Sequence, residues 1–248
     1  MKKIIATTIA AGLVAGVASA AVSTTLDFAS AYVFRGYTLN DGPVVQPGIE
    51  ASGFGLPEEY GSIAVGAWAN YDLDDYAPTG VTGSYFSETD WYGSYSLPAF
   101  VEGLDLFVGY AEYTYGSGSA DKELNFGAGY EVSGFYIAGT VYKGVGGLIG
   151  TQLYLEGALG YGMDISETLS GSVDATFGYL DPDVDGSDSG FNDYTVGASL
   201  GYAISEKWSA GASVTYIGQG DDTILVDVDQ GGGYDVDVVG MLSFACDM

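Results

Sequence analysis

From about residue 24 onward, apolar and polar side chains alternate in segments of roughly ten residues, separated by stretches rich in Gly, Asp and Ser. A period of two is typical of a β-strand, because successive side chains point to opposite faces. The pattern therefore predicts an all-β chain of twelve strands. We place them at about 24–35, 43–52, 61–71, 88–97, 104–115, 122–132, 135–143, 152–163, 169–180, 192–203, 208–217 and 234–245.

The two faces of each predicted strand differ in chemistry. In segment 122–132 one face is small or polar, and the other is apolar or aromatic: Leu124, Phe126, Ala128, Tyr130 and Val132. A soluble β-sandwich also alternates, but its strands usually run to about 5–6 residues. Most segments here reach ten or more, the length that a tilted transmembrane strand needs. Strand length therefore favours a transmembrane antiparallel β-barrel.

Aromatic residues lie near the ends of several predicted strands, where a membrane barrel carries its interfacial girdles. They are Tyr32, Phe34, Tyr71, Trp91, Tyr161, Tyr202 and Trp208. The alternative explanation is that aromatic residues favour strands of any kind. Connection lengths agree with the membrane barrel, which has long external loops and short periplasmic turns. We expect the acidic segments 72–87, 181–191 and 218–233 outside, and the short turns 133–134 and 204–207 in the periplasm.

For two predicted strands the sequence does not decide which face points inward. In 104–115, Glu112 continues the phase of the apolar face, and in 135–143 Tyr136 and Tyr142 oppose the apolar positions. A bulge could re-phase either strand.

The N-terminus has the pattern of a secretory signal peptide. Lys2 and Lys3 precede an apolar run, and Ala18-Ser19-Ala20 supplies the small residues of a cleavage site. We therefore expect residues 1–20 to be a cleaved signal peptide and 21–248 to be one outer-membrane barrel domain in a bacterium. No later stretch comes near the roughly 20 consecutive apolar residues of a membrane helix, so a spanning chain would have to be a closed barrel.

Composition limits the chemistry. The chain has 33 acidic and 6 basic residues, and cleavage would remove two of the basic ones, leaving a formal charge of −29. Such a charge disfavours nucleic acid as a partner and favours cations. The chain has no His, which excludes Ser-His-Asp catalysis, and its single Cys246 excludes an internal disulfide. We expect no enzyme and no catalytic residues, although paired carboxylates could still perform acid–base chemistry.

The stretch Tyr32-Val33-Phe34-Arg35-Gly36, followed by Pro43-Val44-Val45-Gln46, resembles the N-terminal signature of the TorF-type porin family of bacterial outer-membrane proteins. Ala67-Trp68-Ala69 is similar to that family's small-Trp-small segment. The resemblance covers roughly residues 28–70. It implies an outer-membrane barrel with a pore role, and it carries over no substrate and no catalytic residue.

Arg35 is the most informative single residue. In segment 24–35 its phase opposes the aromatic face, so we expect it in the lumen together with inward carboxylates. The candidate pore-lining set is Arg35, Asp27, Glu50, Glu88, Asp90, Glu123, Glu131, Glu156, Asp174 and Asp193. One interpretation makes Arg35 a selectivity element in an acidic pore. The other is that carboxylates clamp its forked guanidinium and rigidify the wall.

Segment 181–188 is the sharpest local motif. Asp181, Asp183 and Asp185 place oxygen ligands at positions one, three and five, followed by Gly186, as at the start of a Ca²⁺ loop, and Asp188 completes the candidate metal set. The twelfth position is Asn192 instead of a bidentate Glu. The alternative is a solvated acidic loop, and apart from Ca²⁺ here we expect no cofactor.

Together these features predict a narrow diffusion pore with an acidic, cation-preferring lumen. The pore would be narrow because the interior of a twelve-stranded barrel is wider than that of an eight-stranded barrel and narrower than that of a large porin. Its partners would be outer-membrane lipid and small solutes or cations. The alternative is a structural or surface-interaction barrel whose acidic loops bind divalent cations or a partner.

Overall fold

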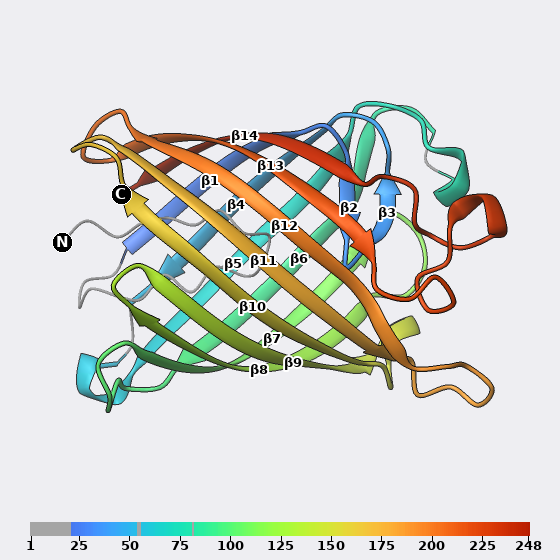
Figure 1. Ribbon diagram of the computed structural model, residues 1–248, viewed down its shortest axis with the longest axis horizontal. Helices are drawn as coiled ribbons and strands as arrows, with labels where there is room; N and C mark the ends of the chain where they lie inside the picture. Colours follow the sequence, from blue (N-terminus) through green and yellow to red (C-terminus); the bar gives the residue numbers. More distant parts are fainter. Residues whose placement is uncertain (1–20, 54–55, 81) are drawn as a thin grey trace.

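The computed structural model describes residues 21–53, 56–80 and 82–248. The predicted signal peptide lies outside this range. Twelve antiparallel strands form a closed barrel, as the sequence predicts (Figure 1). They are β1 (Ala21–Ala29), β4 (Val44–Ser52), β5 (Ser62–Asp72), β6 (Tyr85–Ser96), β7 (Leu104–Tyr115), β8 (Asp121–Val132), β9 (Phe135–Gly146), β10 (Leu153–Asp164), β11 (Leu169–Asp181), β12 (Gly190–Ala203), β13 (Trp208–Gln219) and β14 (Val238–Asp247).

Each strand pairs with its neighbour in the chain, and β1 pairs with β14 to close the barrel. Ser23 on β1 lies opposite Asp247 on β14, so the first and last strands meet at one end, which we call the termini end. Closure leaves no free edge in the barrel sheet, and each of its twelve strands has two hydrogen-bonded neighbours. In the described residues, no helix has the length and apolar character to cross a membrane.

The connections differ between the two ends. At the termini end they are 53–61, 97–103, 133–134, 165–168 and 204–207. At the opposite, loop end they are 30–43, 73–84, 116–120, 147–152, 182–189 and 220–237. The three segments that we expect outside therefore share the loop end, and both short turns lie at the termini end (Figure 1).

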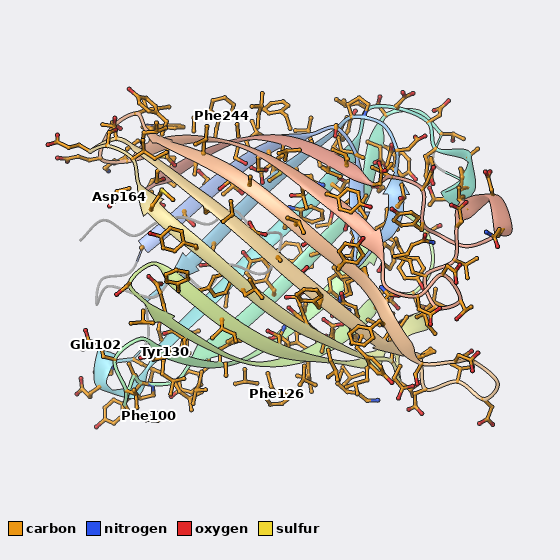
Figure 2. The ribbon with its side chains drawn as sticks, in the orientation of Figure 1. Phe100, Glu102, Phe126, Tyr130, Asp164 and Phe244 are labelled. Atoms are coloured by element: carbon orange, nitrogen blue, oxygen red, sulfur yellow. The ribbon has the colours of Figure 1, made fainter. Side chains whose placement is uncertain are left out.

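The outer face is apolar. Phe126 and Phe244, on opposite sides of the barrel, both project away from it (Figure 2). Trp91 is 60% exposed and Ile137 is 63% exposed on the same outer surface. Exposed apolar side chains around a whole barrel are what a lipid-facing band requires. Strand pairing settles the inward and outward faces of the two strands that the sequence left undecided. In β7, Glu112 lies on the outer face beside Lys122. In β9, Tyr136 and Tyr142 face inward, and their part of the strand has no bulge.

One prediction about the first strand is wrong. Barrel strand β1 ends at Ala29, and the chain then forms a separate two-stranded sheet, β2 (Tyr32–Phe34) and β3 (Tyr37–Asn40). We call residues 32–40 the inner hairpin. Alternation of side chains continues across the break, so the period alone could not show that the chain leaves the wall. As a result, Tyr32 and Phe34 do not belong to an outer girdle.

Candidate functional site

The inner hairpin turns on two residues, Arg35 and Gly36. Phe34 pairs with Tyr37, so the connection between β2 and β3 is only two residues long. Both turn residues have positive φ, 51° for Arg35 and 79° for Gly36, as type I′ hairpin turns require. A Cβ at Gly36 would lie 2.4 Å from the Cδ2 atom of Leu225, so glycine also allows the close approach of the last loop. The turn presents the Arg35 side chain at the tip of the hairpin.

The guanidinium of Arg35 binds Glu123 of β8 through two hydrogen bonds. Its NH1 group donates to Oε2 at 2.8 Å, and its NH2 group donates to Oε1 at 2.9 Å. Only 10% of the Arg35 side chain and 2% of the Glu123 side chain are exposed. Such bidentate, charge-assisted pairs are among the strong hydrogen bonds of proteins. The pair joins the tip of the hairpin to the barrel wall, 88 residues away in sequence.

Aromatic rings enclose the same guanidinium. Its Cζ atom lies 4.4 Å from the ring centroids of both Tyr142 and Tyr154, and 4.7 Å from that of Phe34. Tyr113 donates its hydroxyl proton to Oε1 of Glu123 at 3.1 Å. We call the four wall side chains that hold Arg35, namely Glu123, Tyr113, Tyr142 and Tyr154, the Arg35 receptor. They come from four consecutive strands, β7 to β10, and none belongs to the hairpin.

The hairpin also contacts the wall elsewhere. Tyr32 donates to Glu88 of β6 at 3.0 Å, and its ring lies 5.5 Å from that of Trp68 on β5. On the other side, the Asn192 amide of β12 donates to the backbone carbonyl of Arg35 at 2.7 Å. Val33 packs in a core cluster with residues of β13 and β14. The inner hairpin therefore reaches across the lumen from wall to wall.

The last loop, 220–237, covers the hairpin from the loop end. Leu225, against Gly36, is fully buried. The Thr38 hydroxyl accepts the backbone N–H groups of Asp235 and Val236. Loop 73–84 joins this cover, because Tyr76 donates its hydroxyl proton to Asp235 at 3.0 Å. Burial, and then the bond to Asp235, raise the pKa of the Tyr76 phenol well above its ordinary value.

The predicted carboxylates fall on the inner side of the wall strands. Towards the loop end they are enclosed: Glu88 and Asp193 are 5% and 4% exposed. Asp193 accepts hydrogen bonds from Tyr154 at 2.7 Å and from Asn192 at 2.8 Å. Asp27, Glu50, Asp90, Glu156 and Asp174 are partly exposed, and Glu131, near the termini end, is exposed. Lining of a conducting pore by these groups stays a prediction.

Arg35 is the single basic side chain that points into the barrel within the described part of the chain. Lys122 and Lys143 lie on the outer face, near Glu112 and Asp183, and Lys207 lies in a turn at the termini end. The interior therefore has many formal negative charges and one positive charge, which Glu123 already binds.

Sequence reasoning missed several inward groups. Asn70 and Asp72, on β5, are almost fully buried; Asn70 accepts from Gln46 and donates to Asp72. The receptor tyrosines were also missed, although Tyr142 and Tyr154 stand in the phase opposite to apolar neighbours. A tyrosine in the inward phase of a barrel strand is the signal that could have found them.

The predicted Ca²⁺ loop holds no preformed cluster. Asp181 ends β11, and its carboxylate accepts the backbone N–H of Asp183 at 3.0 Å. Asp183 instead lies 3.7 Å from the Nζ atom of Lys143. Among the residues with described positions, no three His, Cys, Asp or Glu side chains are placed to hold one metal ion. Ca²⁺ binding here stays a prediction.

Comparison with solved structures shows where this architecture occurs. An outer-membrane channel from Pseudomonas putida F1 superimposes with a TM-score of 0.59 at 5% identity, covering 94% of this chain and 97% of that one. The KdgM porin superimposes with a TM-score of 0.50 at 9% identity, covering 91% and 98%. The fold is that of a bacterial outer-membrane β-barrel. The Salmonella typhi outer membrane phospholipase, a dimer with bound calcium, superimposes at 0.52 with 12% identity and 90% coverage of both chains. At such identities the likeness shows the fold alone. No family model and no curated protein sequence matches the chain.

Proposed function

We propose that the protein is a narrow, cation-preferring diffusion channel of the bacterial outer membrane, closed in this conformation by its inner hairpin. One observation carries the proposal: a single nine-residue segment bridges the lumen, between wall strands that contact it through tyrosine rings and buried carboxylates such as Glu88 and Glu123. Channels and porins share the barrel architecture. The resemblance of Tyr32–Gly36 to the TorF-type porin signature supports the same function.

Charge supports the preference for cations. Glu50, Asp174 and Glu131 stand in the inward phase of their strands between the middle of the barrel and its termini end, and their partial or full exposure there supports a lining role. Rings of acidic side chains favour cations over anions in channels. Arg35, the one inward basic side chain among the described residues, is paired with Glu123, so it does not offset the negative potential of the other inward carboxylates.

The alternative is a structural or surface-interaction barrel whose acidic loops bind divalent cations or a partner. The filled loop end favours it, because Leu225, Asn40 and Asn192 have no exposed surface there. Under this alternative the hairpin is a permanent part of the core, and its removal would leave no selective conductance.

Conductance of purified protein in planar lipid bilayers separates the two functions. We expect small or rare steps from the wild type, and larger steps from a variant in which a short Gly/Ser linker replaces residues 32–40. Under a KCl gradient the reversal potential should have the sign of cation preference. Absence of steps in the linker variant, or anion preference, would contradict the proposal.

A matched pair of variants tests the role of charge. In the linker variant, Asp174→Asn removes an inward carboxylate, and Glu112→Gln removes an outward one. We expect the first to reduce cation preference and the second to leave it unchanged. Circular dichroism should show the same strand content in both.

A further inference from the structure

The Arg35 receptor has the composition of a binding site for an organic cation. A carboxylate accepts two parallel N–H groups at 2.8 and 2.9 Å, and two tyrosine rings lie at 4.4 Å from the cation. Aromatic faces attract cations, and the forked guanidinium suits a carboxylate in one plane. The occupant in this conformation is a side chain of the same protein.

The receptor belongs entirely to the wall. Glu123, Tyr113, Tyr142 and Tyr154 sit on adjacent paired strands, so withdrawal of the hairpin would leave them in place. Asp193 adds negative charge beside them through its bond with Tyr154. Glu123 would then be a buried carboxylate without a cation, which is a costly state unless water or another cation enters. An empty receptor would therefore attract a solute that resembles the Arg35 side chain.

We propose that the Arg35 receptor is a binding subsite for solutes bearing a guanidinium group, and that Arg35 is its intramolecular competitor. This inference rests on the proposed channel function, because a solute reaches the site only when the hairpin moves aside. It names the class of permeant that the channel would favour: small organic cations with a planar, forked donor group.

Binding of methylguanidinium to the folded protein in detergent tests the inference. Arg35→Gly empties the receptor while its backbone keeps a positive φ that glycine adopts freely. Isothermal titration calorimetry should show one methylguanidinium per chain for R35G and no binding for the wild type. The double variant R35G/E123Q should bind at least tenfold more weakly. Methylurea, which has a similar shape without the charge, should not bind R35G.

Any of three results would overturn the inference. Methylguanidinium could bind R35G and R35G/E123Q equally, methylurea could bind R35G as well as methylguanidinium does, or methylguanidinium could fail to bind folded R35G. Circular dichroism and heat-modifiable gel mobility establish folding, and Arg35→Ala replaces R35G if that variant does not fold. Failure of the channel proposal is distinguishable, because the calorimetry involves no conductance. Binding to R35G with no conductance in the linker variant would leave the subsite intact and refute the channel alone.

Discussion

Glu123→Gln removes the charge that holds the tip of the inner hairpin, and its effect follows from the burial of the pair. Arg35 and Glu123 expose 10% and 2% of their side chains. Breaking a buried ion pair from one side typically costs about 3–5 kcal/mol, because a charge is left without its partner. Gln keeps one oxygen that can accept an N–H, so we expect the lower end, about 3 kcal/mol. Under the channel proposal the hairpin leaves the lumen while the barrel stays folded, so this free energy should appear as release of the hairpin.

Arg35 is the only Arg of the chain, which makes the release measurable. An arginine-specific protease can cut only after Arg35, and only when the hairpin leaves the receptor. At about 1.4 kcal/mol for each factor of ten, 3 kcal/mol raises the released fraction roughly a hundredfold. When opening and closing are fast relative to cleavage, the cleavage rate follows this fraction. We therefore expect Glu123→Gln to be cut about a hundred times faster than the wild type.

Glu131→Gln is the matched control, since Glu131 lies on the same strand and face but is exposed near the termini end. It should be cut at the wild-type rate. Equal rates for E123Q and E131Q, with both barrels folded by circular dichroism, would refute the reasoning that the ion pair holds the hairpin.

Four further outcomes are expected. Gly36→Ala should weaken the closed hairpin by about 1–3 kcal/mol, because the added Cβ would clash with Leu225 and because residue 36 has a positive φ of 79°. The same protease assay measures this change, and an unchanged cleavage rate would contradict it. Tyr76→Phe should cost the loop cover about 0.5–1.5 kcal/mol, read as faster hydrogen exchange in 220–237. The pKa of Tyr76 is raised above its ordinary value near 10, so its hydrogen bond to Asp235 should persist at pH 10 and be lost as the pH rises further. Hydrogen exchange in 220–237 that is already faster at pH 10 than at pH 8, after correction for intrinsic rates, would argue against this. Calorimetry should detect Ca²⁺ binding to the wild type, and Asp185→Asn in segment 181–188 should weaken it. Identical titrations of the wild type and this variant would show that the segment is a solvated acidic loop without a Ca²⁺ site.

The wall of the barrel was predictable from the sequence alone. Alternation with a period of two is a local property, and strand length then distinguished a membrane barrel from a sandwich. Predicted segments such as 104–115 coincide with the strand that forms, and Phe126 and Phe244 lie on the outer face as their phase requires. These features depend only on which side chain follows which.

The interior was decided by tertiary structure. The alternation that runs through Tyr32 and Phe34 has the same period in a wall strand and in a hairpin, so only the pairing of Phe34 with Tyr37 shows that the chain turns inward. The partner of Arg35 lies 88 residues away, and its aromatic neighbours come from two further strands. Such contacts depend on the closure of the sheet, which sets the strands that face one another across the lumen. The sequence by itself determined that Arg35 would be unusual among acidic side chains, and the fold decided what holds it.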